Sequence, residues 1–291
     1  MNTYHIHKNE SVSRLFLDLK DDFSEKTIFV EPGEYDIYRE YRELALPAPP
    51  DDIDAGDYLD RCVFLPPNTR LIGLGQVLFK WSPDKNEITR GEARTWSPLN
   101  VRYGCYVENI SIFCRYGRYC IHDDSHNDEL DRGTLHRYKN IRCIYEFSED
   151  EKGFNNTTGF GFSQKSTIIF EDSELAFEKS PESSPHHSAF YGHSASGFDL
   201  LPEESPTIIL KNSIIRSENN CPRTIRLQSL NRVLLRTRTV IENCHIDGGV
   251  YFTLYKGEGK HAFELTLLKS GHPPLLFDKP EEYPYKVRIF D

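Results

Sequence analysis

The sequence predicts an all-β protein of one domain, a single-stranded, right-handed parallel β-helix in which short strands stack coil on coil. Two observations lead to this prediction: a five-residue pattern that recurs from residue 100 onward, and an apolar strand that accompanies each copy. The chain has 291 residues, of which 38% are hydrophobic and 12% aromatic, so it is long and apolar enough for one extended solenoid.

The N-terminal residues 1–26 are expected to cap the solenoid. Apolar residues within residues 12–19 recur at the i, i+3, i+4, i+7 spacing of one helical face, which predicts a short helix there. A helix at this end would close the first coil of the solenoid.

The first coils are expected in residues 27–99. Residues 27–37 predict a strand, a Pro-Gly turn and a second strand, and residues 70–79 predict another pair of strands. Residues 38–60 between them are acidic and rich in proline, which is typical of a solvated loop. A calcium site among the carboxylates of residues 51–60 is the alternative, although their spacing differs from that of an EF-hand loop.

The recurring pattern is a charged residue, Asn or Asp, a small or apolar residue, any residue, and an apolar one. Copies of the Asn or Asp follow one another at intervals of 31, 32, 40 and 31 residues, which suits a coil of three short strands with loops of variable length. A solenoid also supplies, by winding, the crossover connections that parallel strands require. A β-sandwich would instead show hairpin turns at short, regular spacing. The marker residues are Asn109, Asn140, Asp172, Asn212 and Asn243.

A companion strand lies near each marker, and together they define regular coils over residues 100–255, followed by an expected C-terminal cap over residues 256–291. The companion strands are residues 119–125, 159–164, 189–194, 224–229 and 250–254. Each begins with apolar or aromatic residues, and the first four end in polar ones. If the coils are in register, the polar ends form one column, which would hold His122, Asp123, Asp124, Gln164, Lys165, His193, Arg226 and Gln228.

Charge and cysteine content restrict the partners. A formal net charge of -10 disfavours nucleic acid and anionic membranes, and an anionic polysaccharide would need a local basic cleft. No apolar stretch is long enough for a signal peptide or a membrane span, so we expect a protein made in the cytoplasm and released by lysis or carried on a virion. The seven cysteines form no Cys-x-x-Cys pair and are expected to be reduced core residues, with no metal site and no cofactor.

Six short motifs carry a resemblance to a known family. They are Gly33-Glu-Tyr-Asp36, Leu71-Ile-Gly73, Arg118-Tyr-Cys-Ile-His-Asp123, Gly159-Phe-Gly-Phe162, Phe190-Tyr-Gly-His193 and Thr224-Ile-Arg-Leu-Gln228. Together they resemble pectin-lyase-like β-helix proteins of gut Firmicutes and of their phages and prophages. The resemblance implies a virion-associated or surface-associated protein, often in a tail appendage and often a homotrimer, whose partners are a surface polysaccharide and other virion proteins.

Polygalacturonase-like glycosidases of the same fold use several aspartates, a histidine and a basic residue. By resemblance, Asp123 and Asp124 match the paired aspartates, His193 the Gly-His element and Arg226 the basic element, so these four are the candidate catalytic residues. A lyase would instead use Arg226 or Lys165 as its base. Adjacent strand residues point to opposite faces, so the two aspartates share a cleft only at a strand end or a bulge. The candidate binding residues are His122, Gln164, Lys165, Tyr191 and Gln228.

Three functions remain open at this point. The first is a β-helix that binds a surface polysaccharide without turnover. The second is a polysaccharide depolymerase, either a glycosidase or a uronate lyase. The third is a purely structural assembly module, in which the polar column is a solvent-facing ladder and the aromatic residues fill the interior. Catalysis requires that the four candidate catalytic residues converge on one open groove.

Overall fold

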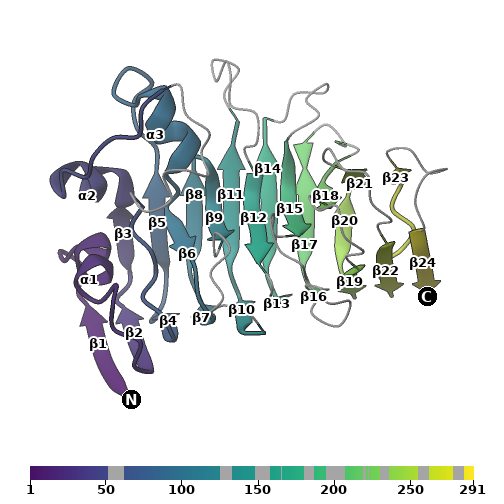
Figure 1. Cartoon of the computed structure of the whole chain (residues 1–291), viewed down its shortest axis with the longest axis horizontal. Helices are drawn as coiled ribbons and strands as arrows, with labels where there is room; N and C mark the ends of the chain where they lie inside the picture. The colour runs from purple at the N-terminus through teal and green to yellow at the C-terminus, as the bar shows by residue number, and fades with distance from the viewer. Residues whose placement is uncertain are drawn as a thin grey trace.

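The protein is a parallel β-helix, as the sequence predicts: three all-parallel sheets wind along one axis, with the two chain ends at opposite ends of it (Figure 1). The computed structural model describes residues 1–51, 62–124, 133–147, 158–164, 166–179, 187–194, 207–218, 221, 223–229, 236–254, 262–277 and 285–291. A complete coil contributes one strand to each sheet, and we name the sheets A, B and C in the order in which the coil meets them.

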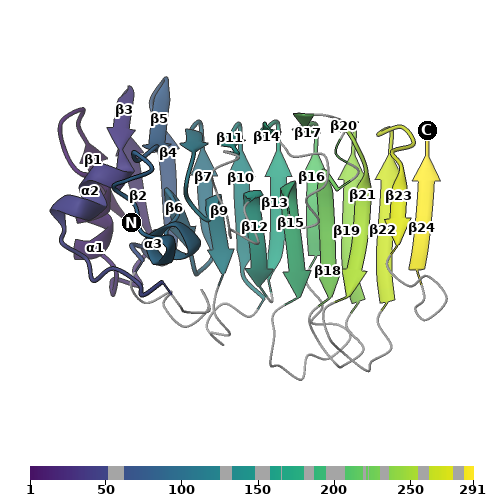
Figure 2. The same cartoon turned by 90° about the horizontal axis from the view of Figure 1, so that it is seen from above.

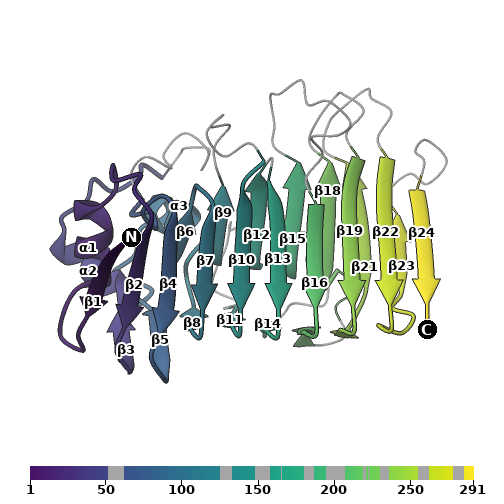
Figure 3. The same ribbon diagram turned by 90° about the horizontal axis from the view of Figure 1, so that it is seen from below.

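Sheet A runs the whole length of the molecule, and Figure 3 shows its strands side by side. In order they are β1 (Asn2–Ile6), β2 (Lys26–Val30), β4 (Thr69–Gly73), β7 (Cys105–Glu108), β10 (Leu135–Lys139), β13 (Thr167–Glu171), β16 (Thr207–Lys211), β19 (Arg236–Glu242), β22 (Ala262–Leu268) and β24 (Tyr285–Phe290).

Sheets B and C each have fewer strands than sheet A. Sheet B consists of β3 (Gly33–Asp36), β5 (Val77–Trp81), β8 (Ser111–Cys114), β11 (Arg142–Glu146), β14 (Glu174–Glu178), β17 (Ile214–Ser217) and β20 (His245–Asp247). Sheet C consists of β6 (Leu99–Val101), β9 (Tyr119–Asp124), β12 (Thr158–Gln164), β15 (Ser188–Ser194), β18 (Ile225–Ser229), β21 (Val250–Leu254) and β23 (Leu275–Phe277). The five predicted companion strands are therefore β9, β12, β15, β18 and β21, in one sheet and in register.

The core is built from columns of like residues, because strands about 4.8 Å apart place each inward side chain on its counterpart in the next coil. Tyr145 stacks on Phe177 with ring centroids 5.2 Å apart, and Phe160 stacks on Phe190 at 5.3 Å. All seven cysteines are free and buried, which confirms the prediction that they are core residues.

The marker residues form the corner between sheets A and B. Asn109, Asn140, Asp172, Asn212 and Asn243 all have positive φ, between 49° and 58°, a backbone conformation that Asn and Asp tolerate better than other residues with a side chain. Their side chains bond from coil to coil: the Nδ2 atom donates to the preceding marker's Oδ1 at 2.7 Å from Asn140, 3.1 Å from Asn212 and 2.9 Å from Asn243. The repeat seen in the sequence is thus a ladder of left-handed turns.

The N-terminal end carries three helices (Figure 2). Helix α1 (Val12–Asp18) lies where the sequence predicts a helix, and its first backbone N–H groups donate to the Glu40 carboxylate at 3.2 and 2.7 Å. Helix α2 (Ile37–Glu43) corrects the prediction of a loop from residue 38 onward. It forms because Asp36 caps it, accepting from the Arg39 N–H at 3.0 Å, and because it buries an apolar face that contacts Trp81.

A third helix, α3 (Arg90–Thr95), lies in the region where only coils were predicted. Thr89 and Glu92 form a capping box at its start, and Arg42 of α2 pairs with the buried Glu92 carboxylate at 2.8 Å. The predicted calcium-binding alternative falls largely on residues 52–61, which lie outside the described residues.

The C-terminal segment continues the coils in the part that the structure describes. Strands β22 and β24 extend sheet A, and β23 extends sheet C, within the residues expected to form a cap. The inward side chains of the final strands are less covered than those one coil earlier: Ile289 is 38% exposed, whereas its neighbour Leu267 is fully buried. Across the described ranges, no helix combines the length and apolar character that a membrane crossing needs.

Candidate functional site

The two candidate aspartates of β9 do not face the same way. Asp123 is in register with Val101 and Phe162, both buried in the interior, and is itself fully buried. Asp124 is partly exposed and lies 3.5 Å from the His122 imidazole. The alternation of the strand therefore separates them, and no bulge brings them back together.

Asp123 belongs to a polar cluster of the core. Its Oδ2 atom accepts a hydrogen bond from the Tyr138 hydroxyl at 2.5 Å and lies 3.0 Å from His136 Nδ1. Cys105 Sγ lies 4.0 Å from the same His136 nitrogen, while His136 Nε2 meets Thr134 at 3.2 Å.

This cluster does not have the geometry of a catalytic relay. One imidazole nitrogen faces both the carboxylate and the thiol, whereas a relay would use one nitrogen for each. Burial raises the pKa of Cys105, and burial followed by the Asp123 charge raises the pKa of Tyr138 well above its ordinary value. Both groups are therefore held in their protonated form inside the core, out of reach of a ligand on the outer face.

The outer face of sheet C carries the predicted polar column in a modified form. His122, Gly161, Tyr191, Arg226 and Tyr251 are in register on successive strands from β9 to β21. Position 161 is a glycine for a steric reason, because a Cβ atom there would lie 2.9 Å from the Tyr119 ring. The neighbouring register position holds Asp124, Ser163, His193, Gln228 and Thr253.

Three arginines on this face each lie over a tyrosine ring. The guanidinium carbon is 5.0 Å from the ring centroid for Arg118 and Tyr119, 4.6 Å for Arg226 and Tyr191, and 4.8 Å for Arg223 and Tyr251. The Tyr191 hydroxyl also donates to Gln228 Oε1, which brings two of the predicted binding residues together. We call these three arginines and three tyrosines the Tyr–Arg stripe.

Burial varies along the stripe. Within the stripe, Tyr119, Tyr191 and Arg226 are buried, and so are the neighbouring Gln228 and His122. Desolvation, followed by the nearby Arg118 charge, lowers the pKa of His122 to about 4, although Asp124 opposes the shift. Arg118, Arg223 and Tyr251 are partly exposed, so these residues form the accessible part of the stripe.

The positions of three predicted site residues are described only in part or not at all. Lys165 is outside the described residues, and for Gln164 and His193 the structure gives the backbone positions in β12 and β15 alone. Among the four candidate catalytic residues, the structure thus brings Asp124 and Arg226 to one face and removes Asp123 from it.

The sequence reasoning did not select Arg118, Tyr119, Arg223 or Tyr251. The signal was present, because Tyr251 occupies the same register position as Arg226, and Arg118 and Arg223 each stand just before a companion strand. A column defined by register, rather than by polar residue type, would have added Tyr251 to the residues selected.

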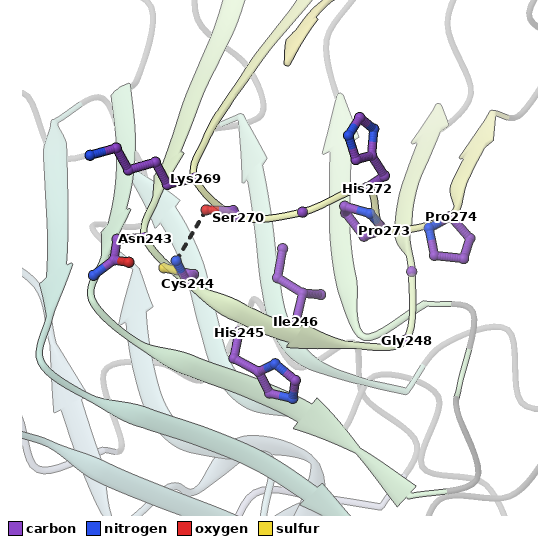
Figure 4. A pocket seen from close by; sticks show the side chains of 12 residues that line it. Asn243, Cys244, His245, Ile246, Gly248, Lys269, Ser270, His272, Pro273 and Pro274 are labelled. Atoms are coloured by element: carbon purple, nitrogen blue, oxygen red, sulfur yellow. Dashed lines mark hydrogen bonds between the residues drawn. The ribbon is translucent and has the colours of Figure 1, made fainter. Parts of the chain in front are cut away.

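A hollow of about 710 Å³ lies at the C-terminal end of sheet B (Figure 4). It forms because β20 is the last strand of this sheet, and residues 269–274 cross the same end without adding another. Ile246 points into the hollow, while Lys269, His245 and His272 on its rim point in different directions. No constellation of chemically matched side chains converges there.

Within the described ranges, no group of three or more His, Cys, Asp or Glu side chains is arranged to hold a metal ion. Comparison of the chain with protein-family models, with curated proteins and with solved structures finds no match.

Proposed function

We propose that this chain is a polysaccharide-binding β-helix protein of the pectin-lyase-like type, associated with a virion or a cell surface. The observation that supports binding is the Tyr–Arg stripe on sheet C. Its accessible part is the Tyr251 ring, which offers a flat apolar surface, and the guanidinium groups of Arg118 and Arg223, which offer planar donors for carboxylate or sulfate groups. On a chain of net charge -10, this local gathering of arginines favours an acidic polysaccharide.

Binding without turnover is favoured over depolymerisation. A glycosidase of this fold needs two carboxyl groups that face one cleft and flank the scissile bond, and Asp123 is committed to Tyr138 and His136 in the core. Among the described residues of sheet C, Asp124 is the carboxyl group left on the outer face, and the tyrosines and arginines beside it are suited to recognition. The virion setting and a homotrimer are part of the same proposal and rest on the sequence motifs.

Native gels containing alginate or chondroitin sulfate provide the test. The unmodified chain is expected to be retarded, and the double variant Arg223→Gln/Tyr251→Ala is expected to bind about tenfold more weakly, because it removes one accessible platform. Arg238→Gln is the matched control, since Arg238 is an exposed arginine on sheet A, 3.8 Å from Glu264. Release of reducing ends or of unsaturated sugars during incubation would contradict a purely binding role.

A further inference from the structure

The outer face of sheet B holds a continuous groove in the N-terminal half of the molecule. A hollow of about 930 Å³ spans four successive coils, from Gly33 to Asn140, and a second of about 300 Å³ adjoins it. Leu78, Ser111 and Arg142 line both hollows, and they are in register on β5, β8 and β11. We call the combined feature the sheet B groove.

The floor of the groove is apolar although it faces outward. Leu78, Phe113 and Ile144 are partly exposed on the outer side of the sheet, where polar residues are the usual choice. Phe113 presents an aromatic surface there. Gln76, Ser111 and Asn140 line the larger hollow next to this floor with amide and hydroxyl groups.

The charges on the rim are neutralised within the protein. Lys80 Nζ lies 2.8 Å from Glu34 Oε1, and this hydrogen bond raises the pKa of Lys80. Arg142 Nε lies 2.8 Å from Glu174 Oε2. The groove therefore combines an apolar floor, uncharged hydrogen-bond donors and acceptors, and charges that are already paired. A uronate or phosphate ligand would require a cation that is not already paired within the protein.

We infer that the sheet B groove is a second ligand site, which takes an uncharged, extended oligosaccharide. A neutral pyranose has apolar C–H faces that fit the Phe113 floor and hydroxyl groups at its edges that fit the polar rim. A chain of such sugars has the elongated shape that a groove across four coils accommodates. This site is separate from the Tyr–Arg stripe, which lies on sheet C and favours acidic sugars.

Affinity gels with neutral polymers test the inference. We expect retardation by at least one of galactomannan, hydroxyethylcellulose and dextran, and a loss of about tenfold in affinity for Phe113→Ala. Ser111→Gln is a second variant that fills the groove without touching the core. Ile214→Ala is the matched control, because Ile214 is 45% exposed in the same outward column, two coils beyond Arg142.

Three results would overturn this inference: no retardation by any of the three neutral polymers, equal retardation of the groove variants and the unmodified chain, or self-association in sedimentation that Phe113→Ala abolishes in the absence of glycan. The last would identify a second copy of the chain as the occupant. The two sites are separable, because Arg223→Gln/Tyr251→Ala should weaken only binding to acidic polymers and Phe113→Ala only binding to neutral ones.

Discussion

Asp123 has a hydroxyl group and an imidazole among its polar neighbours, and all three side chains are fully buried. Asp123→Asn removes the negative charge while keeping the shape, and its amide N–H₂ group replaces an acceptor that faces the Tyr138 hydroxyl. We expect a loss of about 3 kcal/mol in the free energy of unfolding, the magnitude typical of breaking a buried polar pair. Urea unfolding followed by circular dichroism measures it.

Asp172→Asn is the control for this substitution. Asp172 is exposed and holds a marker position at which four other coils already carry Asn, so its stability change should stay within about 0.5 kcal/mol. If both variants unfold at the same urea concentration as the unmodified chain, Asp123 is not the buried partner that the structure shows.

His122 gives the protein a predictable response to acid. Its pKa in the folded state is about 4, below the ordinary value of 6.5, so the unfolded chain binds the proton first as the pH falls. The stability that neutral His122 contributes is therefore present above pH 6.5 and is lost as the pH falls towards 4, by up to about 3 kcal/mol. His122→Gln should flatten this part of the stability profile, measured by urea unfolding at a series of pH values.

The exposed His245 offers the comparison. His245→Gln makes the same change of side chain at the surface and so controls for the loss of a histidine as such. A profile for His122→Gln that parallels that of the unmodified chain would contradict the assignment.

At the scale of elements, substitutions at one marker residue test what selects Asn in the corner turn. Asn212 has φ of 49°, donates to Asp172 at 3.1 Å and accepts from Asn243 at 2.9 Å. Asn212→Ala loses both hydrogen bonds and places a Cβ-bearing residue without a compensating polar group in the left-handed region, so we expect about 2 kcal/mol of destabilisation. Asn212→Gly loses the bonds but tolerates the φ value, and about 1 kcal/mol is expected. Equal urea midpoints for the two variants would show that φ is not what selects Asn here.

The same physics explains which elements the sequence predicts. A left-handed corner in every coil selects Asn or Asp at a fixed place, so the five markers and their companion strands were visible as a repeat. Helices α2 and α3 were missed because neither belongs to a repeat and both lie in regions rich in charged residues. Helix α2 depends on the tertiary contact of Tyr38 and Tyr41 with Trp81, about 40 residues further along the chain, which no local pattern contains.

The candidate site was predictable only in its location. Register placed the polar column on sheet C, but whether Asp123 faces the interior depends on the parity of β9, and its partners His136 and Tyr138 belong to a strand of sheet A. A polar side chain in a solenoid interior looks, in sequence, the same as one on the surface. The Tyr–Arg stripe was partly missed because the polar column was defined by residue type: Tyr191 was selected, whereas Tyr251 at the same register position was not.

At the scale of the whole molecule, the two ends of the solenoid differ. Each coil of a solenoid is stabilised mainly by its neighbours, so a terminal coil is secured from one side unless a cap covers it. At the N-terminal end, α1 buries Val12 and Phe16 in the core. At the other end, β24 is the last strand of sheet A, and Val287 and Ile289 on its inward side are only partly covered.

This asymmetry predicts a gradient of backbone opening along the chain. In hydrogen–deuterium exchange read by mass spectrometry, peptides covering β23 and β24 should exchange fastest among the strands, those of β10 to β16 slowest, and those of β2 closer to the central strands. Phe290→Ala, which truncates an exposed side chain, should change the gradient little, whereas Leu267→Ala in the preceding coil should speed exchange in both β22 and β24. Protection of β24 equal to that of β13 would mean that the end coil is secured by contacts other than those with β22, and the nearest-neighbour account of this solenoid would then be wrong.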